Sequence, residues 1–280
     1  VLLSLHLGLH LGLQQNVVNC ATAATAATAP TAPTAPTAPT APTVAPPPVV
    51  RLASLEWPPY VGEQLPGNGA TATVLRTALA ARGLALHIEF MPWARALETV
   101  RNDPSFHGYF PEYQTADQED LFLFSRPIGV SQLAFAEHSD QPVPWNRLKD
   151  LAPHRIGVVQ GYVNTREFDA LVANGVLRTE PVVDDIANLR KLALGRITLA
   201  IIDPLVFHLL LATTPELFPH AKSLRLQGRI LEEKSLHVCL RKGPAGESLL
   251  QCLNSALEDM DIQAAQDAAV ASVIQSQMSR

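Results

Sequence analysis

Between residues 49 and 280, apolar positions follow two spacings that alternate along the chain. Leu86 and Ile88 are two residues apart with a polar neighbour between them, which is typical of a strand with one buried face. Trp93 and Leu97 are four residues apart, which is typical of an amphipathic helix. The spacings predict strands over residues 49–55, 86–90, 121–124, 132–136, 155–159, 197–202 and 235–240, and helices over residues 70–82, 93–100, 164–174, 186–194, from 204 and 247–260.

Several predicted helices also carry boundary signals. Asp203-Pro204 combines an N-cap carboxylate with proline at the first helical position, where no backbone donor is needed. Asn164 is a second N-cap candidate, with Glu167 at the third position after it. Glycine, which tolerates the left-handed backbone of a helix end, follows three of the predicted helices, at Gly83, Gly175 and Gly195.

The alternation of strands and helices predicts an α/β fold with largely parallel sheets. The alternation occurs as two series, the second starting near Arg155, so two lobes are expected. In open α/β sheets, ligands bind beyond the carboxyl ends of the strands. The loops at these ends are Glu56–Tyr60, Phe110–Gln118, Gln160–Tyr162 and the turn at Asp203.

The start of the chain has a different composition, since the first charged residue is Arg51. Val1–Leu13 is apolar, and Ala21-Thr22-Ala23 has the spacing of a signal-peptidase site. Residues 1–23 are therefore predicted to be a signal peptide, although it lacks an initiating Met and basic residues. One alternative is a low-complexity tail without a targeting signal. The other is a lipid anchor at Cys20, which the bulky residue before the cysteine disfavours.

Residues 24–48 consist largely of Thr-Ala-Pro repeats. Proline at every third position prevents a helix or a central strand, and the segment has too few apolar residues for a core. It is predicted to be a disordered, extended linker. It is either a spacer that holds the folded part away from a surface or a repeat expansion without a function.

Charge and motif content exclude several classes of function for the remaining region. The net charge is −5, and Lys and Arg do not cluster, which argues against nucleic acid as a partner. The chain contains nine histidines but no metal-ligand spacing, and no nucleotide-binding or nucleophile motif, so no metal or cofactor is predicted. Cys239 and Cys252 either form a disulfide or are two buried thiols.

The loop sequences resemble those of extracytoplasmic solute-binding proteins of ABC transporters, of the polar amino-acid type with the type II periplasmic-binding fold. Each segment is short, but their order and spacing over residues 49–280 support the resemblance. The segments are Glu56–Tyr60, Met91–Ala96, Gly108–Tyr113, Phe122–Ile128, Ile156–Tyr162 and Leu194–Asp203.

The resemblance implies two α/β lobes joined by two hinge strands, near Leu133–Ala136 and His237–Leu240. Lobe 1 would comprise residues 49–134 plus 238–280, and lobe 2 residues 135–237. The implied protein is a periplasmic monomer that is not an enzyme. It would capture a small polar solute between its lobes by hinge closure and deliver it to an ABC permease in the membrane.

Two positions depart from the family pattern. The family commonly has Thr-x-x-Arg, in which the arginine holds the α-carboxylate of the ligand, whereas Thr115 is followed at that position by Gln118. An amide cannot replace the charge of an arginine fork. Thr198 stands where the family commonly has Asp. Either the ligand is therefore not a standard α-amino acid, or another cation binds its carboxylate. Arg95 is a candidate for that cation, although it could equally be an exposed residue at a helix start.

Candidate ligand contacts follow from the loops and the resemblance, each with a structural alternative. Trp57 and Tyr60 could form an aromatic wall, or pack against the first helix. Gly161 precedes a helix N-terminus that could receive an anion, or only serves the turn. Asp203 could contact the ligand, or only cap its helix. The candidate set is Glu56, Trp57, Tyr60, Arg95, Phe110, Glu112, Tyr113, Gln118, Gly161, Tyr162 and Asp203.

Two alternatives to transport remain from the sequence. One is a ligand-sensing or degenerate relative that does not serve a transporter. The other is an enzyme on the same fold, similar to cyclohexadienyl dehydratase, in which Glu112 would be the acid or base.

Overall fold

The computed structural model describes residues 46–279. The predicted signal peptide, Cys20 and nearly all of the predicted linker lie outside the described residues. The strands are β1 (Val49–Ser54), β2 (Ala85–Phe90), β3 (Gly108–Tyr113), β4 (Phe122–Phe124), β5 (Gly129–His138), β6 (Arg155–Val159), β7 (Arg178–Val182), β8 (Leu199–Ile202) and β9 (Leu224–Arg241). The helices are α1 (Ala70–Ala80), α2 (Trp93–Asn102), α3 (Ala116–Glu119), α4 (Arg166–Ala173), α5 (Asp185–Ala193), α6 (Pro204–Thr213), α7 (Pro244–Glu258) and α8 (Ile262–Met278).

The described strands form one sheet in the order β2-β1-β3-β9-β5-β8-β6-β7, with β4 also paired to β9. Strand β1 is parallel to β2 and β3, and β6 is parallel to β7 and β8. Strands β5 and β9 are antiparallel to each other and to their outer neighbours. The two parallel groups correspond to the two strand–helix series, so the predicted α/β fold is confirmed.

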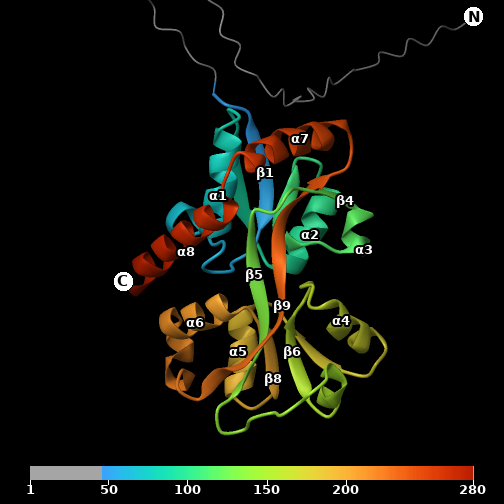
Figure 1. Cartoon of the computed structure of the whole chain (residues 1–280), viewed down its shortest axis with the longest axis vertical. Helices are drawn as coiled ribbons and strands as arrows, with labels where there is room; N and C mark the ends of the chain where they lie inside the picture. Colours follow the sequence, from blue (N-terminus) through green and yellow to red (C-terminus); the bar gives the residue numbers. More distant parts are fainter. Residues whose placement is uncertain (1–45, 280) are drawn as a thin grey trace, which may run out of the picture.

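Two strands connect the two halves of the molecule. Figure 1 shows β1, α1, α2 and α7 in the upper half, α4, α5 and α6 in the lower half, and β5 and β9 running through both. The pairing of β5 with β9 shifts register around Ala134, inside the predicted hinge Leu133–Ala136. We use lobe 1 and lobe 2 for the halves as divided by the sequence; the boundary residues stay a prediction.

The hydrophobic core is continuous between the halves. Its largest cluster includes Leu52 and Leu75 from lobe 1 and Val206 and Phe207 from lobe 2. A smaller cluster around Phe168 lies within lobe 2. Each fully buried side chain of this size contributes about 1.5–3 kcal/mol by leaving water. One core cluster therefore extends through both halves.

The C-terminal helices α7 and α8 both pack against α1, and α8 also touches β5 (Figure 1). The side chain of Gln266 on α8 is buried and completes two hydrogen bonds with β5. Its Oε1 accepts from the backbone N of Val130 at 2.7 Å, and its Nε2 donates to the backbone O of Val130 at 2.6 Å. A polar side chain thus fixes α8 to the strand that enters the hinge.

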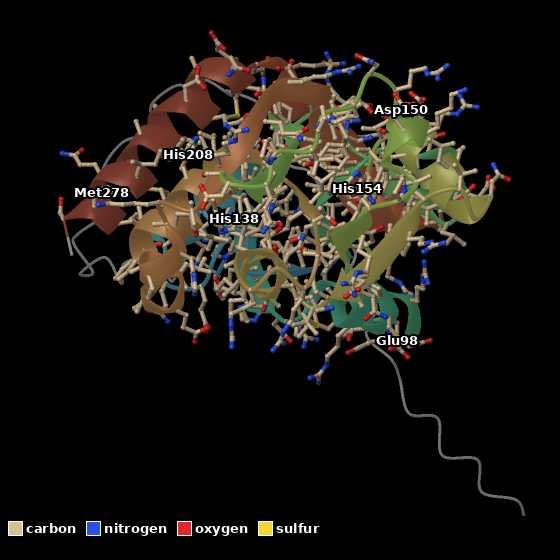
Figure 2. The ribbon with its side chains drawn as sticks, turned by 90° about the horizontal axis from the view of Figure 1, so that it is seen from below. Glu98, His138, Asp150, His154, His208 and Met278 are labelled. Carbon is tan, nitrogen blue, oxygen red and sulfur yellow. The ribbon has the colours of Figure 1, made fainter. Side chains whose placement is uncertain are left out.

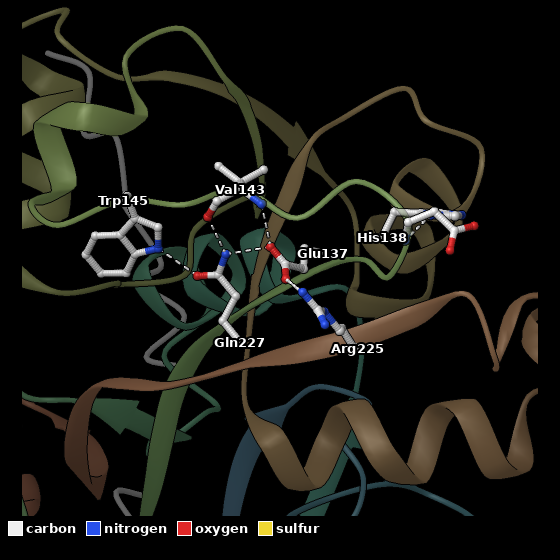
Figure 3. Close-up of polar contacts among 7 residues, drawn as sticks. Glu137, His138, Val143, Trp145, Arg225 and Gln227 are labelled. Carbon is white, nitrogen blue, oxygen red and sulfur yellow. Dashed lines mark hydrogen bonds and ion pairs between the residues drawn. The ribbon is translucent and has the colours of Figure 1, made fainter.

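A second polar cluster joins β5 to β9 at the far end of lobe 2 (Figure 3). Oε1 of Glu137 accepts from Nε and Nη2 of Arg225 at 2.9 and 2.7 Å. Its Oε2 accepts from the backbone N of Val143 and from Nε2 of Gln227, whose Oε1 accepts from Nε1 of Trp145. Burial acts to raise the pKa of Glu137, but these donors outweigh it and the pKa is lowered.

Several predicted details differ from the structure. The segment predicted as a loop at Phe110–Gln118 continues β3 to Tyr113 and contains α3. The helix predicted to start from Asn164 is capped by Thr165 instead, whose Oγ1 accepts from the backbone N of Phe168 at 3.1 Å. Strands β3 and β7 and helix α8 were not predicted, and β9 is longer than predicted. Cys239 is a buried free thiol, so it forms no disulfide with Cys252.

Candidate functional site

Two predicted aromatic residues lie together at the carboxyl end of β1. Trp57 and Tyr60 are both buried, and their rings stack with centroids 4.4 Å apart. The tight turn between them is held by the backbone N of Tyr60, which donates to the O of Trp57 at 2.9 Å. The edge of Trp57 also faces Tyr113, with centroids 6.4 Å apart. Of the two rings, Trp57 lines a hollow between the lobes, and Tyr60 lies against Trp57 without lining it.

Tyr60 and Asp203 connect lobe 1 to lobe 2. The hydroxyl of Tyr60 donates to Oδ2 of Asp203 at 2.9 Å. Oδ2 also accepts from the backbone N of Gln132, while Oδ1 accepts from the first backbone N–H groups of α6. Burial raises the pKa of Tyr60, with the nearby Asp203 carboxylate adding to it, and burial raises the pKa of Asp203. Asp203 thus caps its helix and holds the lobes together.

Trp93 and Gly161 form a second contact between the lobes. Nε1 of Trp93, at the start of α2, donates to the backbone O of Gly161 at 3.1 Å. Gly161 has a φ of 86°, in the left-handed region that favours glycine. A Cβ at this position would lie 3.2 Å from Cδ1 of Trp93. The close approach of the indole therefore depends on the absence of a side chain.

Tyr162 brings a further carboxylate to the site. Its hydroxyl donates to Oδ2 of Asp185 at 3.2 Å. Asp185 is buried at the start of α5, and burial, with a smaller effect from Asp184 and Asp203, raises its pKa to about 7. The sequence analysis did not identify Asp185. The acidic pair Asp184-Asp185, just before the helix predicted from residue 186, is the sequence signal that could have pointed to it.

Glu112 is the one candidate with an unpaired buried oxygen. Its side chain is 3% exposed, and Oε1 accepts from the backbone N of Tyr113 at 2.8 Å. Its Oε2 has no hydrogen-bond partner. Burial raises the pKa of Glu112 to about 8, although the charge of Lys234 acts in the opposite direction.

Lys234 on β9 was not identified from the sequence, because it stands just before the predicted strand as an ordinary polar residue. Its Nζ donates to the backbone O of Asn164 at 3.0 Å and to Oε1 of Glu232 at 3.4 Å. The ammonium group lies 5.1 Å from the ring centroid of Tyr113. No ion pair joins Lys234 to Glu112. Lys234 thus connects β9 to the loop before α4.

The remaining candidates lie at the edge of this group or behind it. Glu56 is exposed, and its Oε1 accepts from the backbone N of Glu63 at 2.9 Å. Arg95 is exposed on α2. Gln118 accepts from the hydroxyl of Tyr109 at 3.3 Å, within lobe 1. Phe110 is fully buried, and its backbone O accepts from Oγ of Ser54.

Two adjoining hollows occupy the space between the lobes. The inner cavity has a volume of about 30 Å³ and is lined by Leu55, Trp57, Trp93, Pro111, Glu112, Tyr113, Tyr162, Val163 and Leu236. The outer groove has a volume of about 290 Å³ and is lined by Leu55, Glu56, Glu63, Phe90, Met91, Pro92, Trp93, Tyr162, Val183 and Asp184. They share Leu55, Trp93 and Tyr162, so the groove leads to the cavity.

The described part of the chain has neither a metal-binding cluster nor a membrane-spanning helix. Residues 46–279 contain no group of three His, Cys, Asp or Glu side chains that could hold a metal ion. None of the described helices is long and apolar enough to cross a membrane.

No family model matches the chain, and no curated protein matches it in sequence. Solved structures match it in fold. The amino-acid ABC transporter substrate-binding protein AbpA from Streptococcus pneumoniae, bound to L-arginine, has a TM-score of 0.66 and 13% identity, covering 82% of this chain and 97% of that chain. This chain has the two-lobe fold of the periplasmic binding proteins.

Two further structures with the periplasmic-binding fold show how widely it is used. A histidine kinase sensor domain with similarity to periplasmic binding proteins has a TM-score of 0.67 and 16% identity, covering 80% of this chain and 95% of that chain. An ancestral amino-acid-binding protein, a precursor of cyclohexadienyl dehydratase, has a TM-score of 0.61 and 14% identity, covering 81% and 95%. At such identities the fold is shared, and the function must be argued from the site.

Proposed function

We propose that the protein binds a small polar solute, an amino acid or a related compound, between lobe 1 and lobe 2. The observation that carries this proposal is the inner cavity, whose lining residues come from both lobes. Trp57 and Glu112 contribute from one side and Tyr162 from the other. Sites that combine an apolar wall with a few buried polar groups are typical of small-molecule binding.

The lobes open and close around the solute by bending at β5 and β9. The bonds from Tyr60 to Asp203 and from Trp93 to Gly161 join residues of the two lobes, so opening would break them. The strands that bend are the two that run through both halves (Figure 1). A solute that adds contacts to both lobes would shift the population toward the closed arrangement.

The closed, loaded protein would present both lobes to an ABC permease after export to the periplasm. The similarity to AbpA supports this role, and the predicted signal peptide agrees with it. The similarity to a sensor domain supports the alternative, a non-transport receptor. Genes for a permease and an ATPase beside this gene would favour transport, and a gene without them would favour the receptor.

A thermal-shift screen tests solute binding directly. Amino acids, polyamines, opines and small organic acids are added at millimolar concentration to the purified protein. A ligand at 100 times its Kd stabilises by about 2.7 kcal/mol, or roughly 5–10 °C in Tm for a domain of this size. If no compound raises Tm, the proposed function is contradicted.

Closure is tested by small-angle scattering with Tyr60→Phe. Removing the hydroxyl deletes the bond to Asp203, so we expect a larger radius of gyration and a weaker solute affinity. Ser125→Ala also removes a buried hydroxyl, but one whose bonds stay within lobe 1. Equal scattering and affinity in the two variants would contradict closure through Tyr60.

A second function is favoured by Glu112. A buried carboxyl group with a pKa of about 8 can hold a proton at neutral pH and donate it to a leaving group. A dehydratase similar to cyclohexadienyl dehydratase needs such an acid. Turnover of prephenate or arogenate, lost in Glu112→Gln, would establish this function, and no turnover by the unmodified protein would reject it.

A further inference from the structure

Glu112 marks a position that a cation would complete. Its Oε2 is buried and has no partner, whereas buried polar atoms in proteins are nearly always paired. Lys234 does not supply the partner, because its ammonium group bonds to Asn164 and Glu232. Glu112 lines the inner cavity, so a donor placed in that cavity can reach the carboxylate.

The other walls of the inner cavity also suit a cation. Trp57, Trp93, Tyr113 and Tyr162 contribute aromatic rings, whose faces attract positive charge. The remaining lining residues apart from Glu112 are apolar. Little water competes in such a place, so a charge-assisted hydrogen bond to Glu112 is stronger there than in solvent.

The approach to the cavity carries negative charge. Glu56, Glu63 and Asp184 line the outer groove, and among the described residues that line the groove or the cavity there is no Lys or Arg. A groove of one sign raises the local concentration of ligands of the opposite sign. The groove also contains Phe90 and Met91, which can accommodate an apolar tail.

A ligand carboxylate finds no matching partner in these hollows. Gln118 and Arg95, the two candidate partners from the sequence, line neither the cavity nor the groove. The charged oxygens of Glu56, Glu63 and Asp184 would repel a ligand carboxylate at the mouth. The lining therefore distinguishes an amine from the amino acid that carries the same side chain.

We propose that the cleft binds a primary alkyl- or arylalkyl-ammonium ion that lacks a carboxylate. The ammonium group occupies the inner cavity and donates to Oε2 of Glu112, and the apolar tail lies in the outer groove. The inner cavity, at about 30 Å³, admits a group close to the size of a water molecule. This inference rests on the proposed solute-binding function and specifies its ligand.

Binding should release a proton. Burial raises the pKa of Glu112 to about 8, so the carboxyl group is mostly protonated at pH 7 and must ionise to pair with the cation. The groups around it are Lys234, His237 and Cys239 on β9 and Tyr109 on β3. Burial lowers the pKa of His237 and raises those of Cys239 and Tyr109, so these three stay neutral between pH 6.5 and 8. Asp185, which accepts from the hydroxyl of Tyr162 in the cavity wall, has a pKa raised to about 7 by burial and titrates in this range as well, so the proton release assigned to Glu112 is the part that Glu112→Gln removes.

Calorimetry with three matched probes tests the ligand class. Phenethylamine, phenylalanine and 3-phenylpropanoate share a tail and differ only in which charged groups they carry. We expect the amine to bind at least tenfold more tightly than phenylalanine and the acid not to bind. Pentylamine against norleucine repeats the comparison with an aliphatic tail.

The role of Glu112 is tested with Glu112→Gln, with Glu98→Gln on the exposed face of α2 as the control (Figure 2). Titrations in phosphate and in imidazole buffer at pH 7, neither of which contains a primary amine, should show up to one proton released per amine bound. Affinity should rise with pH up to 8, by at most tenfold per pH unit. Glu112→Gln should weaken amine binding at least tenfold and remove the proton release that depends on Glu112, with Tm unchanged or higher.

The outcomes separate the two levels of the proposal. If phenylalanine or norleucine binds as tightly as its amine, or Glu112→Gln binds the amine as the unmodified protein does, the ligand assignment is overturned while solute binding stands. If neither these probes nor the wider screen produces binding, both the ligand assignment and the proposed function are overturned.

Discussion

Gly161 is the residue on which the contact between the lobes most directly depends. Its carbonyl accepts from Trp93, and its φ of 86° allows the chain to turn there before α4. Gly175 has a similar φ of 71°, but nothing lies within 4 Å of where its Cβ would be. Substitution at Gly175 therefore introduces backbone strain alone, whereas substitution at Gly161 introduces the same strain and a contact with the indole of Trp93.

We predict that Gly161→Ala and Gly175→Ala both lower the free energy of unfolding, by about 1 kcal/mol, because alanine is strained in the left-handed region. Only Gly161→Ala should also enlarge the radius of gyration and weaken solute affinity, since its methyl group presses on Trp93. Chemical denaturation and small-angle scattering measure both effects. Equal scattering from the two variants would show that the indole accommodates the methyl group.

At the residue scale, the sequence identified which loops contribute to the site but not which side chains they bond to. Trp57, Tyr60, Tyr162 and Asp203 were predicted from loop position, and the structure brings them together. Asp185 was not predicted, because its bond to Tyr162 depends on how α5 packs beside β6, which no local pattern specifies. Whether these residues contact a solute stays a prediction.

Among the elements, α8 is held to β5 by one side chain. Replacing Gln266 with alanine would remove the partner of the part-buried backbone N and O of Val130, so we predict a loss of about 1–2 kcal/mol in the free energy of unfolding. Gln263→Ala, at an exposed position of the same helix, should change it by less than about 0.5 kcal/mol. Urea denaturation measures both, and similar losses would contradict the role of Gln266.

The cluster at the end of β5 and β9 makes a prediction about pH (Figure 3). The pKa of Glu137 is lowered from 4.5 in the folded protein, so the unfolded chain binds the proton more readily. Its contribution is therefore complete above about pH 4.5 and is lost as the pH falls through the lower, folded pKa. The free energy of unfolding should decrease with acidification over this window.

Glu137→Gln tests that contribution. The variant should lose about 2 kcal/mol at pH 7, because an amide cannot accept from Arg225, Gln227 and the Val143 backbone together. Its stability should also vary less between pH 5 and pH 3. Glu247→Gln, at an exposed position on α7, is the control and should keep the original pH profile. An unchanged profile in Glu137→Gln would contradict the assignment.

Element types could be predicted wherever a periodic pattern had clear ends. The strand at Arg155–Val159 and the helix after Asp203 were predicted correctly, because an apolar run and an N-cap with proline define them. Strand β7 contains Pro181 and was missed, since proline removes a ladder donor. Helix α8 was missed because alanine and glutamine dominate it, and its apolar face is weak.

On the scale of the whole molecule, the continuous core predicts cooperative unfolding. The main cluster includes side chains from both lobes, and one sheet runs through the described part of the chain. We expect a single denaturant transition. In a variant whose only tryptophan is Trp145, fluorescence reports unfolding of lobe 2. In Trp145→Phe, the remaining Trp57 and Trp93 report unfolding around the cleft. In both variants the fluorescence midpoint should equal the midpoint measured by far-UV circular dichroism. Two separate midpoints in either variant would contradict this expectation.

The α/β class and the two lobes could be predicted because the strand–helix alternation starts twice. The order of strands could not be predicted from periodicity, since β3 lies beside β9, and only the resemblance of the loops implied that the chain returns. The proposed ligand class also could not be predicted. It depends on which buried oxygen remains unpaired, and that follows from three-dimensional packing around Glu112.

The pairing of β3 with β9 has a consequence for how the protein is made. Gly108 pairs with Leu240, so the upper half of the sheet cannot be completed until the chain has been synthesised almost to its end. The segment between these strands contains β6, β7 and β8 with their helices and can fold earlier on the ribosome. During that interval β3 is an open sheet edge, the kind of surface on which chaperones act or aggregation starts.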